Sequence, residues 1–554
     1  MMQNRRQFLG LLAALATSSL WPQTTQAAQT QPAVDDKNVS TGTPFSWSIL
    51  VDTARQNAQQ PYQPASQPHQ DILQQIDWAA HGQIQFHPEH ALFANGPGQY
   101  PIEFFHPGKF FQTPVHMYRL DDHTSDQASD QASGQDYLAH EILFNRQYFD
   151  MPADSPAQKL GADTQFAGFR IQESRLIDSP DWRYNDWAAF LGASYFRAIG
   201  DEYQYGLSAR GIAINVTVAG QNEEFPAFTK FYFSPAHDNT LIVYALLDGP
   251  SISGAYRFTL TRAKDVVIEI STELFLRRDV ARFGIAPATS MYWFAEKDKP
   301  FQIDWRPEVH DSDGLALWTG NDEHLWRPLN NPAGIAVSAF ADHNPRGFGL
   351  MQRQRHFDNY LDSVHYERRP SLWIEPLQDW GSGAVQLVEL HTSEEIYDNV
   401  VAMWVPAEPA KAGHHYSLHY RLTWAADAPV THSLARCIAT RIGRAGEAGN
   451  RPADSHKFEI EFEGDALQHL AANKQPQIIL STSQGKILNS SCEPVPGSMA
   501  GQHSKHWRVF FDLGKLPTDQ PAELRLKLSD GQSDLTETWL YQFAPPTLNQ
   551  TAAG

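Results

Sequence analysis

The sequence predicts an all-β protein, with a large mutarotase-like antiparallel β-sandwich followed by a smaller immunoglobulin-like β-sandwich. Short alternating runs of β-branched and aromatic residues recur from about residue 100 onward, separated by turns that carry Gly, Pro, Asn or Asp. Helical periodicity is scarce. The chain of 554 residues also exceeds the roughly 250–300 residues at which a single core stops growing, so two domains are expected.

The chain begins with a predicted export signal at residues 1–27. Arg5 and Arg6 precede an apolar stretch, residues 9–20, which is too short to span a bilayer as a mature helix. The paired arginines resemble a twin-arginine signal, and Thr25-Gln26-Ala27 offers a small-residue cleavage site. An ordinary secretory leader remains the alternative. Residues 28–44 are polar and predict a flexible tether.

Residues 45–425 are assigned to the large sandwich. A helical patch is expected where Ile72 and Ile76 are spaced i, i+4. The tandem repeat of Ser-Asp-Gln-Ala at residues 125–132 reads as a surface loop without an assigned function. Strands are predicted at residues 228–233, 240–247, 256–260, 266–270, 384–390 and 416–424.

Residues 426–455 are polar and contain Gly and Arg, a composition that predicts a linker. An active-site loop within this linker is a second possibility. The unit of about 90 residues that follows, 456–546, has the size and strand spacing of an immunoglobulin-like sandwich. Its strands are predicted near residues 457–462, 477–481, 506–512, 523–528 and 537–543.

The composition of the chain disfavours several classes of binding partner. The net charge of −20 argues against nucleic acid and anionic membrane surfaces, whose phosphates would be repelled, whereas a neutral polymer carries no such penalty. No segment after the leader is long and apolar enough for a membrane helix, so the protein is not expected to span a membrane. No metal or organic cofactor is expected, since the two cysteines, Cys437 and Cys492, lack metal-binding spacing. Whether they form a disulfide is left open.

One motif has the mixture of residues that suits a carbohydrate groove. Aromatic and small residues alternate with arginines over residues 190–198 and 203–211. Three further strings make the pattern specific: Gly284-Ile285-Ala286-Pro287, His310-Asp311-Ser312-Asp313-Gly314, and Arg369-Pro370-Ser371-Leu372-Trp373-Ile374-Glu375-Pro376. Together they closely resemble the MdoG/OpgG–OpgD family of periplasmic glucans biosynthesis proteins. The twin-arginine leader is typical of the D members of that family.

The resemblance implies a function, a site and a location. It implies a periplasmic protein of osmoregulated glucan biosynthesis that acts as an inverting endo-β-1,2-glucanase on linear β-1,2-glucan. Asp398 would be the general acid, and Asp311 would be the general base acting through a chain of waters or hydroxyls. From local sequence alone, each aspartate reads equally well as a turn-capping residue.

Four further residues are predicted to contact the glucan: Tyr366, Arg369, Trp373 and Glu375. Internal packing and ion pairing are the alternative for each of them. Two other functions stay open: an inverting transglycosylase or cyclase on the same backbone, and a non-catalytic glucan-binding scaffold. A transient contact with the membrane glucan synthase and a homodimer are also left open as partners.

Overall fold

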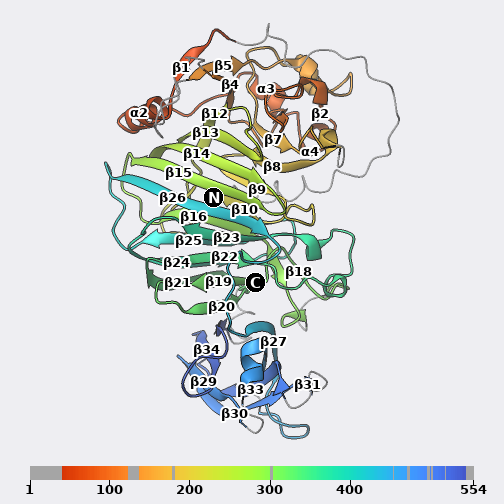
Figure 1. Ribbon diagram of the computed structural model, residues 1–554, viewed down its shortest axis with the longest axis vertical. Helices are drawn as coiled ribbons and strands as arrows, with labels where there is room; N and C mark the ends of the chain where they lie inside the picture. The colour runs from red at the N-terminus through yellow and green to blue at the C-terminus, as the bar shows by residue number, and fades with distance from the viewer. Residues whose placement is uncertain are drawn as a thin grey trace. The chain divides into compact units, whose positions relative to one another are not determined.

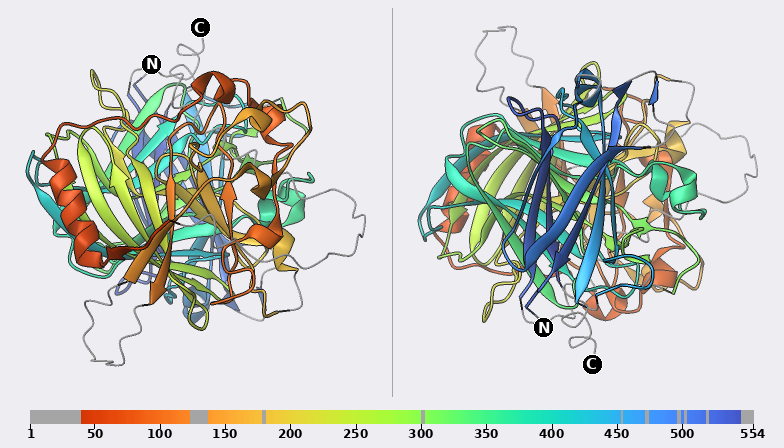
Figure 2. Two further views of the ribbon diagram at one scale, coloured as in Figure 1. Left: turned by 90° about the horizontal axis from the view of Figure 1, so that it is seen from above. Right: turned by 90° about the horizontal axis from the view of Figure 1, so that it is seen from below.

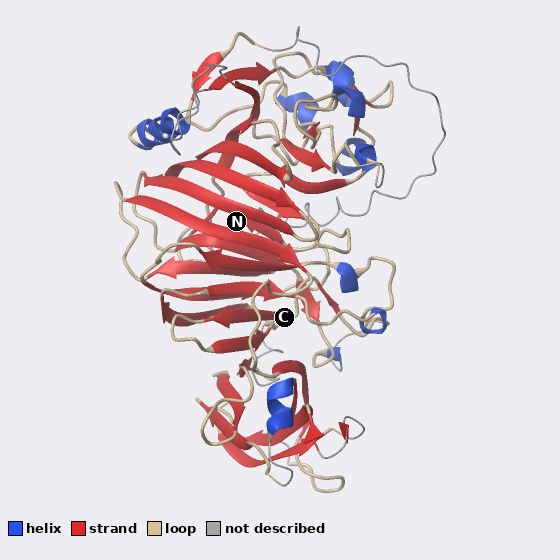
Figure 3. Ribbon diagram, in the orientation of Figure 1, coloured by secondary structure: helices blue, strands red, loops and turns tan. Residues whose placement is uncertain are grey.

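The computed structural model describes residues 40–122, 137–177, 181–299, 303–452, 454–470, 474–495, 499–500, 503–517 and 520–544. The predicted leader, most of the tether and the repeat at 125–132 lie outside the described residues. Strands dominate the described chain (Figure 3), which confirms the all-β prediction. The chain divides into two compact units, one of residues 1–289, 374–379 and 403–425, the other of residues 290–373, 380–402 and 426–554.

The first unit is a sandwich of two sheets. Its larger sheet has the order β1-β5-β4-β12-β13-β14-β15-β26, and its smaller sheet the order β16-β10-β9-β8-β7-β3 (Figure 1). The bounds of the larger sheet's strands are β1 Thr43–Phe45, β4 His116–Asp122, β5 Tyr137–Ile142, β12 Ala227–Phe233, β13 Thr240–Asp248, β14 Ile252–Arg262, β15 Val266–Leu276 and β26 His415–Ala425. Those of the smaller sheet are β3 Ile102–Phe105, β7 Gly168–Gln172, β8 Asp186–Leu191, β9 Tyr195–Ala198, β10 Ser208–Arg210 and β16 Phe283–Ser290.

The strands predicted from alternation in this unit are confirmed and are longer than predicted. Strand β14 pairs along its whole length with β15 and over residues 253–261 with β13, antiparallel to both. Helix α2 (Trp47–Ala58) packs Leu50 and Ala54 against residues of these strands, and Figure 2 shows the helix lying along the sheet. Ser46 caps this helix, because its hydroxyl accepts a hydrogen bond from the Ile49 amide at 3.2 Å. The predicted helical patch near Ile72 forms short helix α3 (Gln70–Leu73).

In the second unit, two sets of strands form a C-terminal sandwich. One sheet has the order β27-β28-β33-β30, and strands β35, β34 and β29 form the other and continue into β20, β19 and β22. Strand β20 joins β35 in parallel, with Trp326 opposite Trp539. The bounds are β19 Gly314–Trp318, β20 His324–Pro328, β22 Gly347–Met351, β27 Arg436–Arg444, β28 Ser455–Glu463, β29 Gln477–Thr482, β30 Lys486–Pro494, β33 His506–Gly514, β34 Ala522–Ser529 and β35 Thr538–Phe543.

Strand β27 lies in the stretch that the sequence predicted to be a linker, so residues 436–444 are a strand instead. Most of its residues are half-exposed rather than alternating between buried and exposed, because β27 is the end strand of its sheet. A strand without alternation gives no periodic signal in the sequence. The expected boundary between the two predicted domains stays a prediction.

Two neighbouring strand pairs of the second unit position the candidate site. Strand β17 (Tyr292–Phe294) pairs antiparallel with the two-residue strand β18 (Val309–His310). Strand β21 (Ile335–His343) pairs antiparallel with β24 (Ser382–Leu390), and a turn at residues 391–399 then leads into β25 (Val400–Pro406).

Candidate active site

Asp311 follows directly after strand β18. Its backbone amide donates a hydrogen bond to the Met291 carbonyl at 2.8 Å, which ties it to the start of the neighbouring strand β17. The side chain is buried, with 3% of the residue exposed, and its carboxylate forms an ion pair with Arg369. A buried charge needs a partner of this kind, and a guanidinium supplies one in a fixed orientation.

Arg369 and Tyr366 support Asp311 from a second segment. A short 3₁₀ turn, Tyr366–Arg368, places the Arg369 guanidinium 4.1 Å from the centre of the Tyr366 ring. Tyr366 is only 2% exposed, and its hydroxyl donates to Glu395 Oε2 at 3.2 Å. Burial raises the pKa of Tyr366, so it is a neutral donor. Arg369 therefore contacts Asp311, and Tyr366 contacts Glu395, in this structure.

Asp398 lies near the end of the turn between β24 and β25 and is 7% exposed. The next residue, Asn399, fixes this turn to β17. Its Oδ1 accepts from the Tyr292 amide at 2.8 Å, and its Nδ2 donates to the Tyr292 carbonyl at 2.9 Å and to the Leu390 carbonyl at 2.8 Å. Because Asp311 is bound to Met291 and Asn399 to Tyr292, consecutive residues of the chain anchor the segments that carry the two aspartates.

Arg306 joins three segments around this region. Its guanidinium pairs with Asp304, Asp362 and Glu395. Burial alone would lower the pKa of Arg306, but Asp304 and Glu395 outweigh burial and raise it. The same guanidinium lies 5.9 Å from the ring centre of Trp305, which is 67% exposed. The sequence contained no signal that distinguished Trp305 from the other tryptophans around it. The ring of Trp305 is therefore open to a ligand.

The other predicted contacts lie elsewhere. Trp373 is 3% exposed, and its indole covers Gly347 so closely that a Cβ atom built there would lie 2.4 Å from the ring. Glu375 lies in the first unit, where it pairs with Arg421 at 3.2 Å. The structure thus pairs Arg369 with Asp311, places Tyr366 against the Arg369 guanidinium, and packs Trp373 against Gly347. The glucan contacts of all four stay predictions.

A cavity of about 60 Å³ lies beside the same motif, with Asp313, Glu308, Arg353 and Thr440 in its lining. This volume holds a few waters, since a single water needs roughly 10–15 Å³. Asp313 Oδ2 accepts hydrogen bonds from the amides of Arg353 and Gln354, both at 3.0 Å, and burial raises the pKa of Asp313. Strand β27 supplies Thr440, and the active-site loop expected within residues 426–455 stays a prediction.

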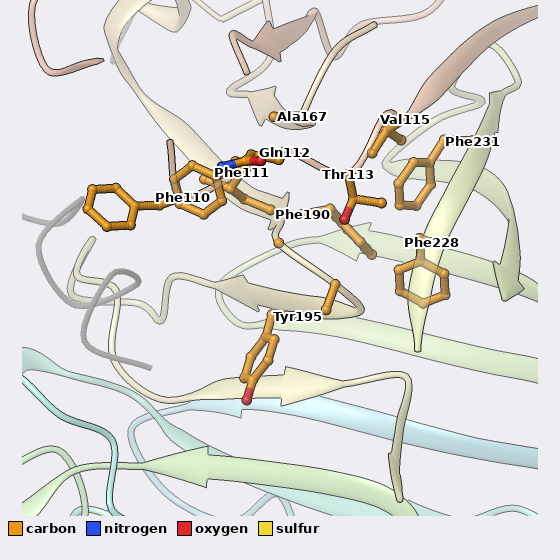
Figure 4. A pocket seen from close by; sticks show the side chains of 13 residues that line it. Phe110, Phe111, Gln112, Thr113, Val115, Ala167, Phe190, Tyr195, Phe228 and Phe231 are labelled. Atoms are coloured by element: carbon orange, nitrogen blue, oxygen red, sulfur yellow. The ribbon is translucent and has the colours of Figure 1, made fainter. Parts of the chain in front are cut away.

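The aromatic run at residues 190–198 is core, so the prediction that it forms a carbohydrate groove is wrong. Phe190 stacks between Phe169 and Phe196, with ring centres 4.7 and 5.0 Å apart, and each ring is at most 1% exposed. Figure 4 shows the hollow beside this run, to which Phe190, Tyr195 and Phe228 contribute. Its volume of about 30 Å³ has room for about two waters and none for a glucose ring.

Among the residues that the structure describes, no group of three His, Cys, Asp or Glu side chains could hold a metal ion. Cys437 and Cys492 are free and buried, on strands β27 and β30, which two other strands of the sheet separate. In the described part of the chain, no helix is long and apolar enough to cross a membrane.

The fold and the site thus define an all-β protein in which two buried aspartates, on separate segments, are anchored to one short strand. Comparison with known proteins assigns the family. Residues 45–543 match the model of the periplasmic glucan biosynthesis protein family, MdoG, and the chain belongs to that family.

Relatives in this family match over nearly their full length. The chain is 53% identical over 556 residues to glucans biosynthesis protein D 2 of Ralstonia nicotianae, covering 98% of each chain. It is 40% identical over 559 residues to glucans biosynthesis protein D of Xanthomonas campestris, covering 99% of each. It is 41% identical over 511 residues to the protein of that name from Stenotrophomonas maltophilia, covering 91% of this chain and 90% of the relative. The predicted family is confirmed, and with it a role in glucan biosynthesis.

Proposed function

We propose that the protein is a periplasmic, inverting endo-β-1,2-glucanase that acts on the glucose backbone of osmoregulated glucans, with Asp398 as general acid and Asp311 as general base. Membership of the family supports a role in glucan biosynthesis and a periplasmic location. The linkage and the roles of the two aspartates rest on the resemblance of the His310-Asp311-Ser312-Asp313 and Tyr397-Asp398-Asn399 motifs to those of the family.

One observation carries the proposal: the segments bearing Asp311 and Asp398 are hydrogen-bonded to the consecutive residues Met291 and Tyr292. Inverting hydrolysis needs two carboxyl groups held rigidly on opposite sides of the scissile bond, with room for a water between. Both aspartates are buried, Asp311 is held by its own backbone amide and Asp398 by the side-chain hydrogen bonds of the next residue, Asn399. Such anchoring preserves the geometry that general acid–base catalysis requires.

The environment of Asp311 fits the role of general base. Asp311 is ion-paired with Arg369, so it is a carboxylate, the form that a general base needs. The polar cavity beside Asp313 has room for a few waters, which fits a base that reaches its nucleophile through a relay. Trp305 adds an exposed indole face, which suits stacking on a glucose ring.

The test is product analysis of the purified mature protein incubated with linear β-1,2-glucan in EDTA. The expected result is shorter linear glucans whose new reducing ends form first as the α anomer, seen by NMR at early times. Cyclic or lengthened products would instead identify a transglycosylase. Tight glucan binding with no new products would identify a scaffold, and a β anomer formed first would rule out inversion.

A further inference from the structure

Three buried polar side chains beside Asp311 have no role in the proposed reaction. His310 is 0% exposed, Gln352 is 1% exposed and Glu308 is 4% exposed. Burying an acid, an imidazole and an amide together is costly unless every donor meets an acceptor. The contacts of these three residues therefore determine where their hydrogens lie.

The Gln352 amide has one orientation that its neighbours allow. Its Nε2 faces two carbonyl oxygens, that of His310 at 3.0 Å and that of Tyr366 at 3.2 Å. Carbonyl oxygens only accept, so this end of the amide must be the NH₂ group, and it uses both of its hydrogens. The other end, Oε1, lies 2.8 Å from His310 Nδ1 and can only accept. His310 Nδ1 must therefore be protonated.

The other ring nitrogen shares a proton with Glu308. His310 Nε2 lies 2.8 Å from Glu308 Oε2, a distance that requires a proton between them. With Nδ1 already protonated, either the ring is an imidazolium facing a carboxylate, or the ring is neutral and Glu308 holds the proton. In both forms the pair has no net charge and contains one shared proton. Asn359 Nδ2 donates to the remaining oxygen, Glu308 Oε1, at 3.0 Å.

The surroundings of His310 favour retention of this proton. Burial alone lowers the pKa of His310, but the hydrogen bond and the charge of Glu308 outweigh burial and raise it. The Asp313 carboxyl acts in the same direction through its charge. The aromatic neighbours, Tyr292 and Tyr360, have ring centres 5.6 and 5.4 Å from that of His310. Burial raises the pKa of both tyrosines, so both are neutral.

The same amide fixes both halves of the ion pair at Asp311. The carbonyl of His310 immediately precedes Asp311, and the carbonyl of Tyr366 begins the turn that leads to Arg369. Gln352 holds these two carbonyls with one NH₂ group, and the Nδ1–H of His310 holds the other end of the amide. Glu308 in turn holds the far side of the His310 ring at Nε2, so removal of Glu308 frees the ring that supports Gln352 and reaches the Asp311 carboxylate through two intermediate residues.

We propose that Glu308, His310 and Gln352 form a positioning network, closed by one shared proton, that holds the Asp311–Arg369 ion pair in the geometry the reaction needs. The assignment of the three as positioning residues rests on the proposed function. The proton arrangement itself does not depend on that function.

The kinetic test compares three variants. Glu308→Ala leaves His310 Nε2 without a partner, and we expect kcat on β-1,2-glucan to fall about 10- to 100-fold with KM changed less than about threefold, as for a misplaced catalytic group. Glu308→Gln should restore most of the lost kcat, since its NH₂ can donate to a neutral Nε2 while its carbonyl still accepts from Asn359. Gln352→Glu replaces the two donated hydrogens with an acceptor and should be at least as damaging as Glu308→Ala. Equal kcat in Glu308→Ala and wild type would overturn the proposal.

Two readouts do not need activity. In protein labelled with ¹⁵N-histidine, the His310 signal, assigned by its absence in His310→Gln, should report a protonated Nδ1 in wild type and in Glu308→Gln. A ring with unprotonated Nδ1 would overturn the proton assignment. A crystal structure of Glu308→Ala should show the Asp311–Arg369 pair separated, and an unchanged pair would overturn the coupling. If wild type cleaves no glucan, the proposed function fails while these two readouts still decide the network.

Discussion

Two regions of the molecule, one in each unit, bury different kinds of side chain. In the first unit, Phe169, Phe190 and Phe196 pack against the rings of Phe231 and Phe258 from the facing sheet. In the second, the neighbourhood of Asp311 buries carboxylates, guanidinium groups and an imidazole. Apolar burial stabilises the fold in proportion to area, whereas a buried ion pair contributes little net stability for its desolvation cost. Such a concentration of buried charges is typical of a functional site.

The largest expected effect is on activity, in the second unit. Asp398→Asn and Asp311→Asn should each lower kcat on β-1,2-glucan by about 10²- to 10⁴-fold, because an amide can neither donate the leaving-group proton nor activate water. Binding of glucan, measured by calorimetry, should persist.

The matched control is Asp358→Asn, an exposed aspartate of the same unit. Its kcat should equal that of wild type. Near wild-type turnover in either active-site variant would remove that residue from the mechanism, and a similar loss in the control would indicate a nonspecific effect.

The matching change in the first unit should act on stability. Phe190→Ala removes a ring that contacts four others, and it should lower the free energy of unfolding by about 3–5 kcal/mol. Denaturant unfolding of this unit measures the loss, and kcat per folded molecule should stay at the wild-type value. A selective fall in kcat without a loss of stability would show that the aromatic cluster is functional after all.

Strands could be predicted from the sequence, whereas the role of the aromatic run could not, because strand alternation is local and the contacts of the aromatic rings are not. Alternation along a strand is local, so β13 and β28 could be predicted within one or two residues of their observed ends. Whether an aromatic face meets a sugar or another sheet depends on residues far along the chain. Phe190 meets Phe258, 68 positions away, and no local pattern encodes that contact.

In the candidate site, too, some residues could be predicted from local sequence and others could not. The motif placed Asp311, and its resemblance to a family assigned a role to it. Only one of the two hydrogen-bond partners of His310 is close to it in the sequence. Glu308 is two residues away, whereas Gln352 is 42 residues away and is brought to His310 by strand β22. Strand β27 escaped prediction because an end strand that is half-exposed on both faces shows no alternation.

The contribution of the His310–Glu308 pair to the stability of the second unit should depend on pH. The raised pKa of His310 means that the pair with Glu308 stabilises the fold fully below the unfolded histidine pKa of about 6.5. This stabilisation is lost as pH rises through the higher folded-state pKa. Glu308→Gln should therefore be less stable than wild type by about 1.5–3 kcal/mol near pH 6, the value of a hydrogen bond to a charged group.

Denaturant unfolding of both proteins between about pH 6 and pH 9 measures this difference, which should shrink as pH rises. Phe190→Ala is the control, because the destabilisation from a lost apolar contact carries no histidine titration. A constant difference between Glu308→Gln and wild type across this range would mean that His310 does not take part in a titrating pair.

The smallest expected effect concerns Trp305, the exposed aromatic residue beside Arg306. With 67% of its surface exposed, Trp305 contributes little to packing, so Trp305→Ala should leave the free energy of unfolding within about 0.5 kcal/mol of wild type. If its indole stacks on a glucose ring, KM should rise about three- to tenfold, corresponding to roughly 1 kcal/mol, with kcat nearly unchanged. Trp305→Phe should recover part of the loss because it keeps an aromatic face. An unchanged KM in Trp305→Ala would confine glucan recognition to other residues and leave Trp305 a surface residue with no part in binding.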